Sequence, residues 1–130
     1  MKEDVKEEVL NFLYHNPFIL IPDCIHIEKK PPLNHERVPD FIVQTSSGYF
    51  IVVELESPRK TLFTKEKGFP EHKDLKNARA QIERYLEFVR NNILYLRHRY
   101  PDISAEKIRG LLVIGLKSNM TKDEINRLKR

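Results

Sequence analysis

Three carboxylates lie in a stretch of otherwise apolar, strand-forming residues, 38–58, which reads VPDFIVQTSSGYFIVVELESP. Asp40 follows a proline, and Glu54 and Glu56 lie two residues apart near the end of the stretch. Ionised carboxylates are unfavourable among buried side chains unless a cation or hydrogen-bond donors accompany them. A hard divalent cation such as Mg²⁺, bound by one or two carboxylates and completed by water and a substrate phosphate, is the most natural partner. The pattern therefore suggests metal-assisted chemistry on a phosphate.

The sequence SSG predicts the turn of a β-hairpin, with Gly48 in the left-handed conformation that suits a three-residue loop. The strands are expected over 38–45 and 49–56, and their pairing would place Asp40 opposite Glu54, with Cβ atoms about 5 Å apart. Because side chains alternate along a strand, all three carboxylates gather on one face at the end of the hairpin away from the turn. The alternative is a solvated strand end, where lysine or arginine neutralises the acidic groups.

Apolar periodicity elsewhere in the chain predicts the elements that must position this hairpin. They are an amphipathic helix over 3–14, a short edge strand over 24–27, a long helix over 74–99, a strand buried on both faces over 110–116 and a last helix over 121–130. The buried stripe of the long helix is expected to be Leu75, Ala78, Ile82, Tyr85, Leu86, Val89, Ile93 and Leu96. The order αβββαβα predicts an α/β protein whose central mixed sheet is flanked by helices.

The composition predicts a single globular domain over 1–130. The chain is 40% hydrophobic and 32% charged, and no apolar run approaches the roughly 20 residues of a membrane span. Cys24 is the single cysteine, so no internal disulfide is expected, and the N-terminus does not resemble a signal peptide. We therefore expect a cytoplasmic protein without a membrane partner. The net charge of +4 permits a polyanionic partner but does not demand one.

Several stretches, in this order and spacing, resemble a known nuclease group. PDF at 39–41 and VVELES at 52–57 resemble the PD-(D/E)xK nuclease superfamily, and QIERY at 81–85 matches the Q-x-x-x-Y pattern of many of its DNA-processing members. FLYHNPFIL, LFT, HKDLKNARAQIERY and GLLVIG extend the resemblance to the Shedu anti-phage defence nucleases over most of the chain. The resemblance implies a restriction-endonuclease-like αβββαβ core, which agrees with the order of elements predicted above.

The resemblance also implies roles for the carboxylates. Asp40 and Glu54, helped by the carbonyl oxygen of Leu55, would bind a catalytic Mg²⁺ or Mn²⁺ ion. The third signature position is usually lysine, and here it is Glu56, which cannot stabilise the negative charge that develops on a phosphate. Some restriction enzymes of the superfamily use glutamate there, so Glu56 is expected to act as a general base or as an extra metal ligand. A degenerate site that does not cleave is the alternative.

A displaced lysine could supply the missing positive charge. The candidates are Lys60, Lys65 and Lys73, and Lys73, just before the long helix, is preferred, with a solvated surface lysine as the alternative. Gln81 could reach a metal-bound water or the DNA backbone, or it could be an ordinary helix-surface glutamine. Tyr85 lies in the apolar stripe, where core packing is its expected role.

The function predicted from these residues is metal-dependent hydrolysis of DNA, and the Shedu resemblance implies a role in anti-phage defence and assembly into a homo-oligomer. Five arginines of the long helix could follow a phosphate backbone or form a solvated face: Arg79, Arg84, Arg90, Arg97 and Arg99. The alternatives are a nuclease-fold module that only binds nucleic acid or mediates assembly, and an α/β domain that binds only protein. Because the helical pattern still continues at Arg130, the chain could be a trimmed domain.

Overall fold

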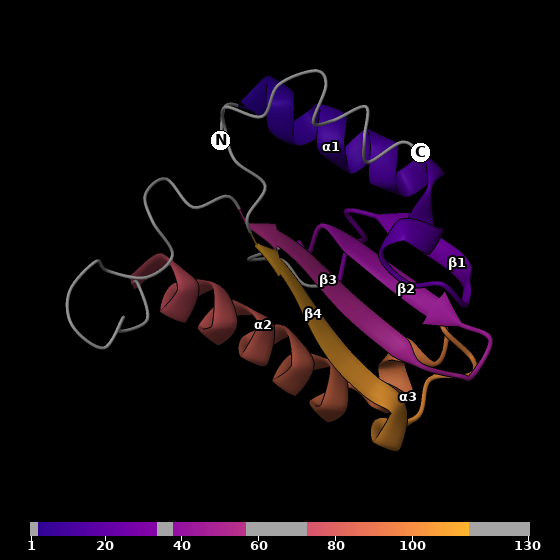
Figure 1. The fold of residues 1–130 in the computed structure, drawn as a ribbon. Coiled ribbons are helices and arrows are strands. Elements are labelled where there is room, and N and C mark those ends of the chain that lie inside the picture. Colours follow the sequence, from indigo (N-terminus) through magenta and orange to yellow (C-terminus); the bar gives the residue numbers. More distant parts are fainter. Residues whose placement is uncertain (1–2, 34–37, 57–72, 115–130) are drawn as a thin grey trace.

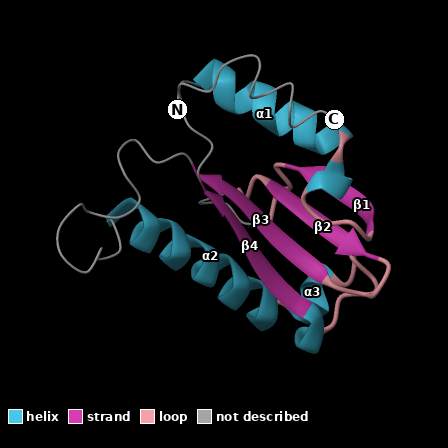
Figure 2. Ribbon diagram, in the orientation of Figure 1, coloured by secondary structure: helices cyan, strands magenta, loops and turns pink. Residues whose placement is uncertain are grey.

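The structure, a computed structural model, describes residues 3–33, 38–56 and 73–114. Its elements in chain order are α1 (Glu3–His15), η1 (Pro17–Ile19), β1 (Cys24–Lys29), β2 (Phe41–Thr45), β3 (Phe50–Glu56), α2 (Lys73–Asn91), α3 (Ile93–Leu96), η2 (Ala105–Lys107) and β4 (Ile108–Ile114). Figure 2 shows these helices and strands by type. The major elements confirm the predicted αβββαβ core. The helix predicted over 121–130 lies outside the described residues.

The strands form one mixed sheet in the order β1-β2-β3-β4. The pairs β1–β2 and β2–β3 are antiparallel, whereas β3 and β4 are parallel. Parallel neighbours need a crossover connection, and α2 provides it. α1 covers one face of the sheet and α2 covers the other (Figure 1). The predicted edge position of β1 is confirmed, and this strand continues two residues beyond the predicted 24–27.

The hairpin has the predicted register. Phe41 pairs with Val53, so Asp40, which precedes Phe41, lies level with Glu54. Gly48 has a φ of 89°, the left-handed conformation expected of the turn glycine. β2 begins at Phe41 rather than at 38, because Pro39 has no amide hydrogen for the ladder. Asp40 therefore lies just outside the strand, where its side chain can take over part of the hydrogen bonding.

Side chains on the two faces of the hairpin enter separate apolar clusters, as their alternation predicts. The cluster beneath α2 includes Ile42, Phe50, Val52, Ile82, Tyr85, Leu86 and Val89. The cluster beneath α1 includes Val9, Leu10, Leu13, Phe41, Val43, Val53 and Leu55. The sheet is thus clamped between two helices, and burial of both faces makes the hairpin a rigid support for the residues at its end.

β4 begins at Ile108, two residues before the predicted 110–116. Leu111, Leu112 and Val113 are only partly buried, so the expectation of full burial on both faces is wrong for this described part of the strand. β4 is an edge strand of the described sheet, which leaves one of its sides uncovered there. Gly110 allows α2 to approach closely, because a Cβ atom at this position would lie 2.5 Å from Cγ2 of Ile82.

The long helix predicted over 74–99 ends early, at Asn91. Asn92 has φ −125° and ψ 27°, and its side-chain amide donates a hydrogen bond to the carbonyl of Phe88 over 2.8 Å. A side-chain donor of this kind competes with the backbone for a helical carbonyl. The short α3 follows, and Tyr100 then packs edge-to-face on Phe50 with ring centroids 5.0 Å apart. None of the helices in the described ranges is both long and apolar enough to cross a membrane.

Candidate functional site

Asp40 and Glu54 meet at the end of the hairpin, as the register predicts. The main-chain amide of Asp40 donates a hydrogen bond to Oε1 of Glu54 over 3.0 Å. The amide of Leu55 donates in return to Oδ2 of Asp40 over 2.7 Å. Each carboxylate is therefore held by the backbone of the opposite strand. The exposed fractions are 6% for Asp40 and 7% for Glu54, so both acids are buried. The alternative prediction of a solvated strand end is therefore wrong for these two residues.

The turn after β1 helps to hold Asp40. Lys30 has a φ of 48°, a left-handed conformation that is uncommon for a residue with a side chain. Its amide donates to the carbonyl of Asp40 over 2.8 Å, which continues the β1–β2 pairing past Phe41. Such a backbone conformation persists only where surrounding structure enforces it, and such positions cluster at functional sites. The backbone of Asp40 is thus fixed from both β1 and β3.

Burial raises the pKa of both acids. For Glu54, burial and then the neighbouring Asp40 carboxylate raise the pKa to about 8, against the lowering effect of the Asp40 amide. For Asp40, burial raises the pKa, and the Leu55 amide and the Lys6 ammonium oppose the rise. Near neutral pH the pair therefore holds a proton in the absence of another cation. A binding cation must displace that proton, so metal affinity is coupled to pH.

Lys6 joins the site from α1, and the sequence interpretation missed it. Its Nζ lies 3.8 Å from Oδ1 of Asp40, and the Lys6 side chain is 36% exposed. The helical spacing contained a signal: Lys6 precedes the buried Val9 and Leu10 by three and four positions, on the face that α1 turns toward the sheet. A lysine on the buried stripe of an amphipathic helix needs an anionic partner. Asp40 is that partner here.

The third predicted carboxylate lies further from the pair. Glu56 is partly buried at the end of β3, and its charge raises the pKa of Glu54 less than burial and the Asp40 carboxylate do. Within the described ranges, no group of three or more His, Cys, Asp or Glu side chains is arranged to hold a metal ion. The structure thus brings two of the three carboxylates into one cluster. Glu56 borders that cluster.

Gln81 and Tyr85 contact each other. Nε2 of Gln81 donates to the hydroxyl of Tyr85 over 3.1 Å, and Gln81 is partly buried. Tyr85 is 2% exposed within the α2 cluster, which confirms its predicted core role. Lys73 opens α2, and its side chain lies outside the described part of the structure, as do Lys60 and Lys65.

The strand pairing places Gln81 within about one helical turn of the level of the carboxylate pair along the sheet. α2 and β4 run in opposite directions (Figure 1), and Gly110 lies against Ile82. Glu54 pairs with Leu112, which lies two residues beyond Gly110 on β4. Because α2 runs the other way, this distance corresponds to about one helical turn from Ile82 toward the start of α2. Gln81 falls within that turn.

The donor set suits a hard divalent cation. Two buried carboxylate oxygens from Asp40 and Glu54, together with the nearby backbone of Leu55, are oxygen ligands of the kind that Mg²⁺ takes in small number while it retains several waters. The raised pKa of Glu54 shows that the present neighbours do not fully compensate the second negative charge. A divalent ion would do so, and the residues therefore fit the metal that the resemblance implies.

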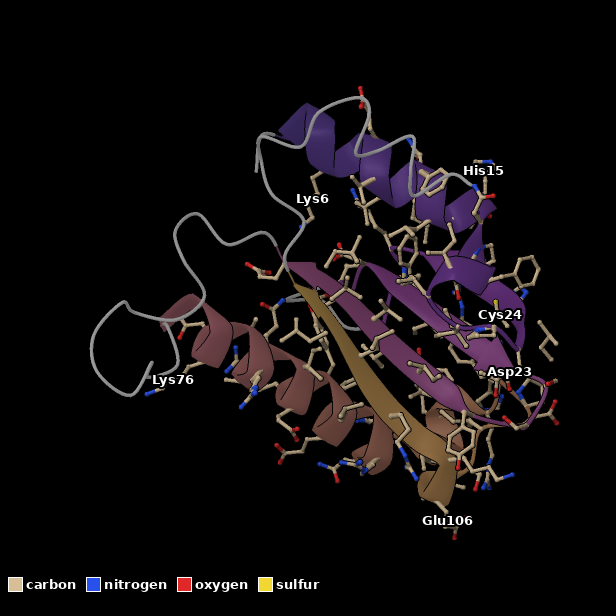
Figure 3. The ribbon with its side chains drawn as sticks, viewed as in Figure 1. Lys6, His15, Asp23, Cys24, Lys76 and Glu106 are labelled. Carbon is tan, nitrogen blue, oxygen red and sulfur yellow. The ribbon has the colours of Figure 1, made fainter. Side chains whose placement is uncertain are left out.

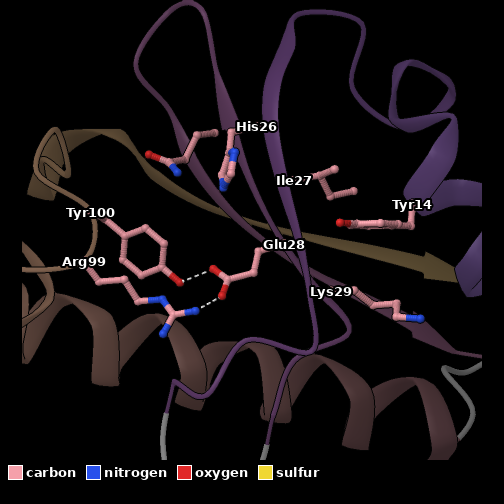
Figure 4. Close-up of a pocket in the computed structure, with 8 residues that line it drawn as sticks. Tyr14, His26, Ile27, Glu28, Lys29, Arg99 and Tyr100 are labelled. Atoms are coloured by element: carbon pink, nitrogen blue, oxygen red, sulfur yellow. Dashed lines mark hydrogen bonds and ion pairs between the residues drawn. The ribbon is translucent and has the colours of Figure 1, made fainter.

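A pocket of about 510 Å³ lies beside β1, away from the carboxylates (Figure 4). Its wall includes an ion pair between Arg99 and Glu28 and a 2.6 Å hydrogen bond from the Tyr100 hydroxyl to Oε1 of Glu28. Arg99 is therefore occupied by Glu28 and follows α3, so the prediction that it extends a basic face of the long helix is wrong. Arg97 also lies outside α2, whereas the other three predicted arginines are exposed on it.

The architecture defines the class of the protein. A mixed sheet with α1 and α2 on opposite faces is the restriction-endonuclease-like fold, and two solved structures share it. One is a repair endonuclease from Pyrococcus abyssi, with 21% identity and a TM-score of 0.54 over 99% of this chain. The other is EndoMS in complex with double-stranded DNA, with 19% identity and a TM-score of 0.54 over 95% of this chain. The chain spans 44% and 41% of the lengths of these two proteins.

The family follows from the sequence. The model of the family described as Shedu protein SduA, C-terminal, matches residues 4–129. The chain therefore belongs to this family, and the Shedu resemblance is confirmed. A search of curated proteins gave no match.

Proposed function

We propose that this chain is a metal-dependent nuclease domain that hydrolyses DNA phosphodiester bonds in anti-phage defence. The observation that carries the proposal is the buried pair of Asp40 and Glu54, held by reciprocal backbone hydrogen bonds at the end of a rigid hairpin. Membership of the Shedu family supports the defence setting. The endonuclease fold of the two solved structures, one of them bound to double-stranded DNA, supports DNA as the substrate.

In this proposal Asp40, Glu54 and the carbonyl of Leu55 hold Mg²⁺ or Mn²⁺. When bound, the ion would supply Lewis-acid polarisation of the scissile phosphate and would lower the pKa of water there. Glu56, at the rim of the pair, orients the attacking water and accepts its proton. Gln81 hydrogen-bonds that water or the DNA backbone from α2. Lys73, the preferred displaced lysine, would lie at the start of the same helix and donate to the phosphate.

The protein is further proposed to act in the cytoplasm as a homo-oligomer. The chain spans less than half the length of each of the two similar solved proteins. Cleavage of DNA and assembly with partners are therefore proposed for this chain and are not inferred from those proteins.

A specific observation also favours a second function, a nuclease-fold module that binds nucleic acid without cutting it. Asp40 already has a backbone donor and the Lys6 ammonium as partners, and glutamate replaces the signature lysine at position 56. A site of this kind could keep its fold and lose its metal. Metal dependence separates the two functions, and salt-dependent affinity for DNA separates the second from a domain that binds only protein.

Cleavage of supercoiled and linear DNA with Mg²⁺ or Mn²⁺, beside EDTA controls, tests the proposal. The variants are Asp40→Asn and Glu54→Gln, and the matched control is Glu87→Gln, which changes an exposed glutamate on α2. We expect metal-dependent cutting by the wild type and the control, and none by the two site variants. The proposal is abandoned if nothing is cut and calorimetry shows no Mn²⁺ uptake that depends on Asp40 and Glu54.

A further inference from the structure

Three carboxylates lie at the end of the hairpin, where the proposed phosphate would bind. Asp40, Glu54 and Glu56 contribute up to three negative charges, and a phosphodiester would add a fourth. Like charges in a buried site repel strongly, and a single divalent cation cannot neutralise four of them. A cation near Asp40 would therefore favour the approach of an anionic substrate.

Lys6 is such a cation. It projects from α1 toward the sheet (Figure 3), and its Nζ lies 3.8 Å from Oδ1 of Asp40. Of the charged groups that lower the pKa of Asp40, Lys6 has the largest effect, and it also lowers that of Glu54. The Lys6 side chain is 36% exposed, against 8% for that of Asp40. Lys6 is therefore the more solvent-accessible partner of this ion pair.

Two other lysines, at the end of β1 and in the turn that follows, contact α1. Lys29 Nζ donates to Oδ1 of Asn11 over 2.6 Å, and Lys30 Nζ contacts Oε1 of Glu7 over 2.6 Å. These short contacts tie α1 to the end of β1. The separation of 3.8 Å between Lys6 and Asp40 is longer than a hydrogen bond, so the ammonium is drawn to the carboxylate without being locked to it.

We infer that Lys6 is a catalytic residue of the proposed nuclease, whose ammonium turns from Asp40 to a non-bridging oxygen of the scissile phosphate when a divalent cation binds the carboxylates. The inference rests on the proposed function. Lys6 keeps its proton and forms no covalent bond, and its role is to stabilise the negative charge that grows on the phosphate. The four-carbon stem of lysine allows this reorientation while α1 stays in place. Lys6 thereby adds, beside the proposed Lys73, positive charge that Glu56 cannot supply.

This role predicts opposite effects on metal binding and on cleavage. Removal of the ammonium takes away a cation that competes for Asp40, so Mn²⁺ is expected to bind about 3- to 10-fold more tightly. The same change removes a donor to the phosphate and is expected to slow cleavage about 10- to 100-fold. A residue with only a structural role would lower both quantities together or leave both unchanged.

The experiment compares Lys6→Met with wild type and with Lys76→Met, which alters an exposed lysine that points away from the sheet in Figure 3. Mn²⁺ affinity is measured by calorimetry without DNA, and cleavage is measured at saturating Mn²⁺. Tighter Mn²⁺ binding with slower cleavage, in Lys6→Met alone, supports the inference. Lys6→Arg keeps the charge and is expected to cut within about 10-fold of wild type. If Lys6→Met does not fold, the same comparison is made with Lys6→Gln.

The other outcomes separate the two proposals. If wild type and Lys6→Met cut DNA equally fast, the proposed role of Lys6 is overturned and the nuclease function is left intact. Lys6→Met that loses both Mn²⁺ affinity and cleavage makes Lys6 a support of the metal site and also overturns the inference. Wild type that cuts no DNA while binding Mn²⁺ overturns the nuclease function, and the role of Lys6 falls with it.

Discussion

The main-chain amide of Asp40 donates a hydrogen bond to Oε1 of Glu54 over 3.0 Å, so one acid holds the carboxylate of the other through its backbone. The amide of Leu55 completes the exchange by donating to Asp40 over 2.7 Å. The hairpin register positions these donors, and both bonds favour the ionised form of the acid that accepts them. The same hydrogen bonds therefore connect the chemistry of the site to the stability of the fold.

Glu54→Gln is expected to stabilise the metal-free protein at high pH. Because the pKa of Glu54 is raised to about 8 in the folded state, the folded protein retains a proton that the unfolded chain releases near its ordinary value of 4.5. The contribution of Glu54 to stability is therefore present below pH 4.5 and is lost as the pH rises to about 8. Glutamine is neutral and its Oε1 can still accept the Asp40 amide. The gain should be about 1 to 3 kcal/mol at pH 9 and small at pH 5.

Urea denaturation in EDTA at pH 5, 7 and 9 measures this difference in the free energy of unfolding. Glu87→Gln serves as the control because Glu87 is exposed on α2. A stability difference between wild type and Glu54→Gln that does not change across this range would show that Glu54 titrates normally.

Mn²⁺ affinity is expected to rise steeply with pH and to level off above about pH 8, the pKa of Glu54. Each metal ion must displace the proton of the pair, so the affinity should change by about 10-fold per pH unit below that value. Calorimetry at pH 6.5, 7.5 and 8.5 gives the affinity, and addition of EDTA should reverse the accompanying rise in melting temperature. Equal affinities at the three pH values would refute the coupling between metal and proton.

Glu56→Gln separates the two roles that remain open for Glu56. If Glu56 accepts the proton of the attacking water, the substitution should lower kcat about 10²- to 10⁴-fold while Mn²⁺ affinity stays within about 3-fold of wild type. No group of three His, Cys, Asp or Glu side chains in the described ranges is arranged to hold a metal, which favours this role over direct metal ligation. Loss of Mn²⁺ binding that parallels the loss of kcat would instead assign Glu56 to the metal.

Tyr100→Phe is expected to lower the free energy of unfolding by about 1 to 2 kcal/mol. The hydroxyl of Tyr100 donates to Oε1 of Glu28 over 2.6 Å at a position that is 3% exposed, and phenylalanine would leave that carboxylate with one partner fewer. Thermal or urea denaturation measures the change, and Tyr95→Phe is the control, since Tyr95 is 72% exposed. A Tyr100→Phe variant as stable as the control would show that the segment after α3 is not anchored to β1 through this bond.

Local patterns were sufficient to predict the hairpin and the position of its carboxylates. The left-handed Gly48 and the two-residue period of a strand are properties of neighbouring residues, and together they determine the register that sets Asp40 opposite Glu54. The order of the elements follows from the same kind of pattern. The ends of elements were predicted less well, because side-chain competition at Asn92 and the missing amide hydrogen of Pro39 act against the periodicity.

Tertiary structure alone decided which groups surround the carboxylates. Lys6 lies far from Asp40 in the sequence and reaches it only because α1 packs across the sheet near the start of β2. Glu28 and Tyr100 are brought together in the same way, by the turn of the chain after α3. The angle at which a helix docks depends on the whole apolar surface that it buries, and no local pattern contains that information. The sequence by itself thus predicted which two acids lie together. Only the packing of α1 on the sheet showed that Lys6 is the cation beside them.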